Sequence, residues 1–174
     1  DDADNNIAIG KLAMGGSDVA GADNIAIGTS ALDAVLAGSC NTVVGGRAGT
    51  SLTTGNYNVA IGRDALYTST TGCRNVAVGY NTLGNADTTG INNIAIGTQA
   101  MDALTTGICN VAIGTNALGA STTTCQSIAI GVAALGGAVT TGRDNIGIGY
   151  RTGCALSSGY NNVIIGKTTA DALT

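Results

Sequence analysis

Aliphatic residues recur at alternate positions within a short phrase, Asn-Ile-Ala-Ile-Gly, that repeats along the whole chain. Its ten copies are spaced 17 or 18 residues apart and begin at Asn6, Asn24, Asn41, Asn58, Asn75, Asn93, Asn110, Ser127, Asn145 and Asn162. A fixed short period is typical of a solenoid, in which each repeat forms one coil and stacked coils bury a shared core. Alternation with period two indicates a strand. The sequence therefore predicts an all-β, parallel β-solenoid of ten coils, in one domain spanning residues 1–174.

The first and third positions after the Asn are β-branched aliphatics in every copy, with Thr42 as the one exception. Residues two apart on a strand point to the same side, and β-branched residues favour strands. We therefore expect both positions to form continuous columns that face inward. The third position supplies the predicted core: Ile9, Ile27, Val44, Ile61, Val78, Ile96, Ile113, Ile130, Ile148 and Ile165.

The residue between these two positions is expected to face outward, yet it is small and apolar in most copies. The middle column is Ala8, Ala26, Val43, Ala60, Ala77, Ala95, Ala112, Ala129, Gly147 and Ile164. A continuous exposed apolar stripe of this kind usually marks an interface, so this column is the predicted oligomer interface. The alternative is that another segment of the same coil covers the column.

The remainder of each coil reads as corners and one further extended segment. Gly closes every phrase, and Ala followed by Leu or Met comes soon after it in most coils, which predicts a second short strand opposite the first. Thr-Thr-Gly in the middle coils reads as an exposed corner. The Asn residues that open the phrase are expected to stack as a ladder of side-chain amides: Asn6, Asn24, Asn41, Asn58, Asn75, Asn93, Asn110, Asn145 and Asn162.

Composition and charge argue against several classes of function. The chain has no His and its acids are all Asp, with no recurring pair placed for acid–base chemistry, so we expect neither catalysis nor a metal or cofactor site. Net charge is −4 and the basic residues are scattered, which argues against nucleic acid as a partner. No apolar run approaches 18 residues, so no membrane span is expected.

The five cysteines do not read as a disulfide framework. Cys40 and Cys109 occupy equivalent positions four coils apart, which is roughly 19 Å at the usual strand spacing and beyond the reach of a disulfide. Cys109 and Cys125 lie on adjacent coils, but their offset directs them apart. We expect free thiols, while the odd count leaves a bond between chains open.

The phrase and its spacing resemble the head repeats of trimeric autotransporter adhesins, and are similar to the Asn-x-Ala-Ile-Gly-x-x-Ala-Leu and Thr-Thr-Gly repeats of bacteriophage tail-fibre shafts. The resemblance covers essentially the whole chain. It implies a left-handed parallel β-roll in which three chains pack side by side along their length. It also implies a structural, and in some cases adhesive, fibre on a virion or cell surface, with a host-surface receptor as a further partner.

Two other hypotheses follow from the repeat. Joining residues 170–174 of one copy to residues 1–3 of another leaves one period between phrases, which predicts either head-to-tail stacking into a filament or excision from a longer solenoid. The alternative function is an ice-binding solenoid, because the chain is rich in Thr and the Asn-x-Val-x-Gly phrase also resembles plant ice-binding repeats. A flat face with regularly repeated groups is the property that this alternative requires.

Overall fold

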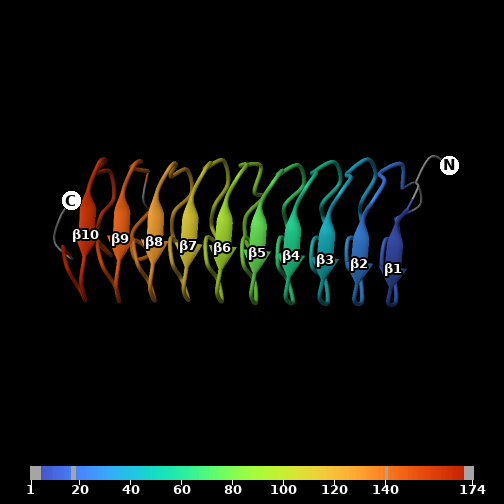
Figure 1. Ribbon diagram of the computed structural model, residues 1–174, viewed down its shortest axis with the longest axis horizontal. Helices are drawn as coiled ribbons and strands as arrows, with labels where there is room; N and C mark the ends of the chain where they lie inside the picture. Colours follow the sequence, from blue (N-terminus) through green and yellow to red (C-terminus); the bar gives the residue numbers. More distant parts are fainter. Residues whose placement is uncertain (1–4, 17–18, 140, 171–174) are drawn as a thin grey trace.

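The chain folds as an all-β solenoid, seen in a computed structural model that describes residues 5–16, 19–139 and 141–170. Each repeated phrase supplies one three-residue strand, and the ten strands lie in chain order in a single sheet (Figure 1). The strands are β1 (Ile7–Ile9), β2 (Ile25–Ile27), β3 (Thr42–Val44), β4 (Val59–Ile61), β5 (Val76–Val78), β6 (Ile94–Ile96), β7 (Val111–Ile113), β8 (Ile128–Ile130), β9 (Ile146–Ile148) and β10 (Val163–Ile165). The predicted fold class is confirmed.

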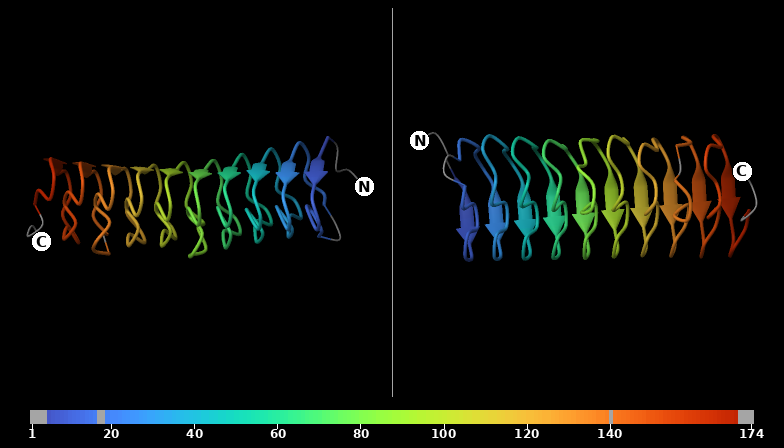
Figure 2. Two further views of the ribbon diagram at one scale, coloured as in Figure 1. Left: turned by 90° about the horizontal axis from the view of Figure 1, so that it is seen from below. Right: turned by 180° about the vertical axis from the view of Figure 1, so that it is seen from behind.

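Every strand pairs in parallel with the next one in the chain, and each pairing joins equivalent residues of successive repeats. Ala60, for example, pairs with Ala77. The strand arrows consequently lie in one layer along one side of the molecule (Figure 2). Residues at the same position of the repeat therefore form continuous columns that run the length of the solenoid.

The predicted second strand of each coil is wrong. The segment after the Gly is a series of tight turns, in which Leu32, Leu66 and Leu118 have φ of 53°, 51° and 50°. This left-handed conformation is incompatible with a strand. Successive coils still hydrogen-bond there, as when Leu66 N donates to Thr82 O at 3.0 Å. The Leu side chains are buried, as the repeat predicts.

The predicted orientation of the strand is wrong, because the column predicted as the oligomer interface is buried and the column predicted as the core is exposed. The middle column lies inside the solenoid, with Ala26, Val43, Ala60, Ala77, Ala95, Ala112, Ala129, Gly147 and Ile164 buried, while Ala8 in the first coil is exposed. The third column lies on the outside, exposed or half-exposed: Ile9, Ile27, Val44, Ile61, Val78, Ile96, Ile113, Ile130, Ile148 and Ile165. The alternative that the coil covers its own middle column is therefore correct.

The interior is too narrow for a different arrangement. Leu side chains from the turn segment reach across the coil to the strand, so that a Cβ built on Gly147 would lie 2.7 Å from Leu135 Cγ. Two columns of Ile and Val on the same side would collide with them, whereas Ala fits. The volume available inside the coil therefore decides which face of the strand points inward.

The Asn side chains form a buried ladder along one corner. Asn58 donates from its backbone N and its Nδ2 to Asn41 Oδ1, at 2.9 and 3.0 Å, and its Nδ2 also donates to Gly72 O at 2.8 Å. Related bonds join the amides of the predicted set on either side of Ser127, which interrupts the ladder. Each amide thus satisfies backbone groups of two coils, which a dry interior requires.

Glycine at the end of the phrase is required for coil-to-coil contact at the opposite corner. Gly62 has φ of 127°, and a Cβ there would lie 2.5 Å from Gly79 O of the next coil. Any side chain would therefore both strain the backbone and separate the coils. The predicted head-to-tail junction falls on residues 1–4 and 171–174, which lie outside the described residues.

Candidate functional site

The outer surface of the sheet is the candidate functional site. We call it the aliphatic face. It consists of the third column and the first column, the latter being Ile7, Ile25, Thr42, Val59, Val76, Ile94, Val111, Ile128, Ile146 and Val163. Both positions point away from the core because they alternate with the buried middle column. Thr42 carries the one hydroxyl among these positions, and none of them is charged.

The third column is the more open of the two. Ile27, Ile61, Ile96, Ile113, Ile130 and Ile148 expose between 37% and 41% of their surface. Exposure rises at the last strand, to 65% at Ile165, which has a neighbour on one side alone. The first column is half-buried on β2 to β5 and on β7 to β9, whereas Ile94 on β6 exposes 39% of its surface.

The aliphatic face is one contiguous apolar surface and not a set of separate apolar residues. Strands about 4.8 Å apart give ten strands a length on the order of 40 Å, and the two columns cover about 10 Å across each strand. The resulting plan area, on the order of 400 Å², is comparable with the largest apolar patch that soluble monomers usually expose. The two columns are also continuous along the sheet, because every strand pair is in register.

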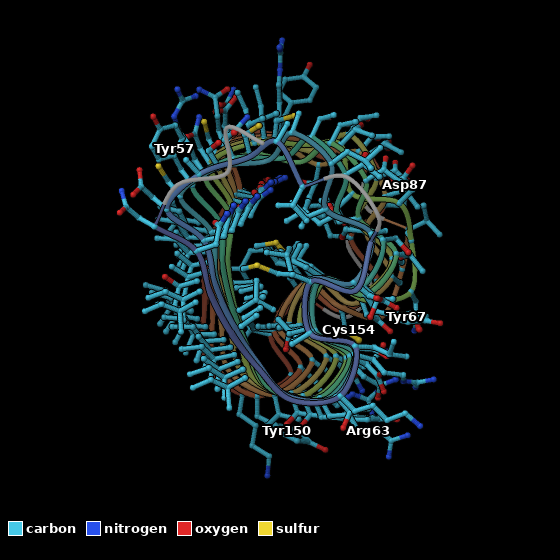
Figure 3. The ribbon with its side chains drawn as sticks, turned by 90° about the vertical axis from the view of Figure 1, so that its right-hand side faces the viewer. Tyr57, Arg63, Tyr67, Asp87, Tyr150 and Cys154 are labelled. Carbon is cyan, nitrogen blue, oxygen red and sulfur yellow. The ribbon has the colours of Figure 1, made fainter. Side chains whose placement is uncertain are left out.

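Two columns of mixed chemistry border the aliphatic face. The leading column, immediately before the repeated phrase, is Asn5, Asp23, Cys40, Tyr57, Arg74, Asn92, Cys109, Gln126, Asp144 and Asn161. The trailing column, immediately after the phrase, is Lys11, Thr29, Gly46, Arg63, Tyr80, Thr98, Thr115, Val132, Tyr150 and Lys167. Figure 3, which looks along the solenoid, shows Tyr57 at one end of the sheet and Tyr150 at the other.

A common backbone conformation holds the leading column in place. All its residues have φ between 55° and 61°, and from Cys40 onward their backbone N atoms donate to the preceding coil, as from Tyr57 N to Ser39 O at 3.0 Å. The side chains therefore project from a fixed corner. Arg74 lies over the ring of Tyr57, with 5.8 Å between its Cζ and the ring centroid, and Lys167 lies 5.9 Å from the ring centroid of Tyr150.

The other polar groupings serve the fold. Arg47 binds the buried carboxylate of Asp64 at 2.7 Å and lies over the ring of Tyr67. This side-chain hydrogen bond with Asp64, reinforced by the opposite charge, raises the pKa of Arg47. The pair crosslinks two adjacent coils on the turn side of the solenoid, away from the aliphatic face.

A surface hollow of about 370 Å³ lies on the turn segments, lined by Gly137, Ala138, Arg151, Cys154 and Ala155. All five cysteines are free thiols. Among the described residues, no three His, Cys, Asp or Glu side chains are grouped to hold a metal ion. The same residues include no helix long and apolar enough to cross a membrane. The aliphatic face is therefore the surface best suited to binding, and what it is suited to bind is another apolar surface.

The residues of the face were identified as β-branched columns from the sequence, but with the wrong orientation. The two border columns were not predicted, because their residue types vary from coil to coil and carry no repeat signal. Comparisons with protein-family models, with curated proteins and with solved structures found no match to this chain.

Proposed function

We propose that this chain is a structural shaft that binds further copies of itself through the aliphatic face, as part of a fibre on a cell or virion surface. The observation that supports the proposal is the unbroken apolar face along ten strands, described above. A contiguous apolar patch of this size often marks a site of interaction. Three copies side by side would match the arrangement that the resemblance to adhesin heads implies.

The size of the face fits this role. The leading and trailing residues of each strand region are six residue steps apart, or roughly 20 Å, so the face and its borders cover on the order of 800 Å² per copy. That is the area that a partner typically contributes to a stable, specific interface. An apolar centre with a polar rim is also the usual anatomy of such an interface.

A charge placed on the face tests the proposal. Replacing Ile113 with Arg should leave the fold intact, because the side chain can extend into water, but should prevent a second copy from packing there. Thr106→Arg is the matched control, because Thr106 is exposed on the Thr-Thr-Gly corner. We expect sedimentation velocity to show an oligomer for the unmodified chain and for Thr106→Arg, and a monomer for Ile113→Arg. A monomeric unmodified chain at all concentrations would refute the proposal.

Ice binding is a second candidate, favoured by the regular register of the sheet and by one column of exposed threonines on the corner. The column comprises Thr54, Thr71, Thr89, Thr106, Thr123 and Thr141. Thermal hysteresis measured for the unmodified chain and for Thr106→Arg, which places a charge in the threonine column, distinguishes the two functions. Hysteresis from a monomeric chain that is lost in Thr106→Arg would favour ice binding over the shaft.

A further inference from the structure

We infer that the copies pack with parallel axes and in register, so that the leading column of one copy lies against the trailing column of the next at the same strand level. This inference rests on the proposed function, since it specifies how the aliphatic faces meet. It is carried by the chemistry of the two border columns. The partner that fits them is a second copy of this chain.

The geometry of the sheet links orientation to which borders meet. Rotating one copy about an axis parallel to the solenoid turns its face toward its neighbour and exchanges the two borders, so leading residues meet trailing residues. This holds for two copies face to face and for a closed ring of three. Rotation about an axis perpendicular to the solenoid instead brings leading residues against leading residues. The two orientations therefore predict different pairs of side chains.

In the parallel, in-register arrangement the border residues of β4 and β5 are complementary. The leading Tyr57 of one copy meets the trailing Arg63 of the next, and one strand further the leading Arg74 meets the trailing Tyr80. All four side chains are exposed. Within one copy Arg74 lies over the ring of Tyr57 and Arg63 Nε lies 3.4 Å from Asp64 Oδ2, so a contact between copies would replace or extend these exposed intrachain contacts. A guanidinium over an aromatic ring is attractive, and Tyr and Arg are enriched where proteins bind one another. At β4 the tyrosine is the leading residue and the arginine the trailing one, whereas at β5 the arginine leads and the tyrosine trails.

The remaining levels agree with the same register. At β9 the leading Asp144 meets the trailing Tyr150, whose hydroxyl can donate to the carboxylate. At β10 Asn161 meets Lys167, whose ammonium can donate to the amide oxygen. No level of the border columns brings two like charges together. In aligned copies the leading column of one copy is therefore complementary to the trailing column of the other.

Other registers lose this match. A slip of one strand brings Arg74 against Arg63, which places like charges together. A slip in the other direction leaves neither arginine facing an aromatic ring of the other copy. An antiparallel pair with full overlap sets Tyr57 against Cys109. An antiparallel pair centred between β4 and β5 keeps Tyr57 beside Arg74 but leaves the faces of β9 and β10 uncovered. The aligned parallel arrangement alone combines the Tyr–Arg pairs with full burial of the face.

Site-directed cross-linking tests the orientation. The background variant keeps Cys40 and replaces Cys73, Cys109, Cys125 and Cys154 with Ser. Gly46→Cys is then added, since a Cβ at Gly46 meets no atom within 4 Å. Cys40 and position 46 lie at opposite borders of β3, too far apart to be joined within one chain by a short bismaleimide. Facing sheets about 10 Å apart place them within its reach across copies.

We expect the reagent to convert most of the Gly46→Cys protein into covalently joined chains. Cys40 alone, and Cys40 with Thr98→Cys three strands away, should stay unlinked. Cross-linking by Asn92→Cys or Gln126→Cys in place of Gly46→Cys would show antiparallel packing and overturn this inference while leaving the shaft intact. A sedimentation run on each variant separates that result from a monomer, which would refute the proposed function as well.

A double-mutant cycle provides an independent measurement. Tyr57 and Arg63 lie at opposite borders of β4, roughly 20 Å apart along the extended strand, so within one chain Tyr57→Ala and Arg63→Ala should act independently. Across aligned copies they are partners. We expect each single substitution to weaken association, and the double substitution to weaken it by less than the product of the two fold-changes. Strictly multiplicative effects on the dissociation constant would overturn the Tyr57–Arg63 contact and the register that it specifies.

Discussion

Thr124 Oγ1 lies 3.3 Å from Ser127 Oγ and donates to Gly142 O at 2.7 Å, the carbonyl that an Asn at position 127 would otherwise bind. Two departures from the repeat thus compensate for one another. Every other coil has Asn at the position of Ser127, and all of them but the first, which has Ala3, have Gly at that of Thr124. At those glycines a Cβ would crowd the Asn amide, as at Gly72, where it would lie 2.9 Å from Asn75 Nδ2.

We therefore predict that Ser127→Asn and Thr124→Gly each destabilise the fold while the pair restores it. Ser127→Asn forces an amide against Thr124, which should cost about 1–3 kcal/mol. Thr124→Gly leaves the buried Gly142 carbonyl without its donor, at a similar cost. The double variant completes the amide ladder. Urea unfolding of all four proteins gives the coupling free energy, and additive losses would contradict this account.

Val43 and Gly49 form a second compensating pair, in the core of one coil. The middle position is usually Ala and the turn position usually Leu, whereas this coil has a larger strand residue and no turn side chain. A Cβ on Gly49 would lie 3.5 Å from Val43 Cγ1, so Val43 occupies the space that a Leu would fill. Gly49 also has φ of 56°, close to that of Leu66 at 51°.

For Val43 and Gly49 we also expect each single substitution to destabilise the fold and the double variant to recover most of the lost stability. Val43→Ala removes two buried methyl groups and should cost about 2 kcal/mol. Gly49→Leu alone should overpack the coil by about 1–3 kcal/mol. Together they recreate the common Ala and Leu pair, so the double variant should unfold within about 1 kcal/mol of the parent. Failure of Gly49→Leu to rescue Val43→Ala in thermal or urea unfolding would mean that the two side chains do not share one space.

The fold was predictable because the repeated phrase recurs at a fixed spacing of 17 or 18 residues. Equivalent positions such as Ala60 and Ala77 are in register throughout the sheet, and the fixed period already required that. The turn segment was less predictable, since nothing in its Ala-Leu pattern indicates that Leu66 adopts a left-handed conformation. That conformation follows from the tight path of the chain, which a single residue type does not reveal.

The orientation of the strand was predictable in principle. Asn58 and Val59 are neighbours, so they point to opposite sides of the strand, and a buried Asn ladder is incompatible with an inward Val column. An amide ladder and an inward first column were both expected from the sequence, and the burial of the ladder excludes the inward column. The pairing of Tyr57 with Arg63 could not be predicted, because it has meaning only once the outer face is known.

Asp102 should make stability depend on pH in the acid range. Partial burial raises its pKa, opposed by the hydrogen bond from Asn85 Nδ2 and by bonds from the backbone amides of Asp102 and Ala103. A carboxyl group with a raised pKa favours folding most when it is protonated, so its contribution is complete below the unfolded pKa of about 3.9 and is lost as pH rises through the folded value.

Asp102→Asn removes this titration and keeps an oxygen that can accept from Asn85. We expect the variant to gain stability relative to the parent as pH rises from about 3.5 to 7, with the difference levelling off above the folded pKa. Urea unfolding at a series of pH values measures it. An advantage for the variant that is the same at every pH, or that grows as pH falls, would contradict the direction of the shift.

Adjacent substitutions on β7 test which face of the strand is the core. Ala112 is fully buried between Ala95 and Ala129 of the neighbouring coils, whereas Ile113 exposes 38% of its surface. Ala112→Arg puts an unpaired charge and a long side chain into a closed interior and should destabilise the coil by more than about 4 kcal/mol. Ile113→Arg should leave the melting temperature nearly unchanged when both proteins are compared as monomers. Circular dichroism during heating distinguishes them, and a folded, stable Ala112→Arg protein would mean that the middle column faces outward.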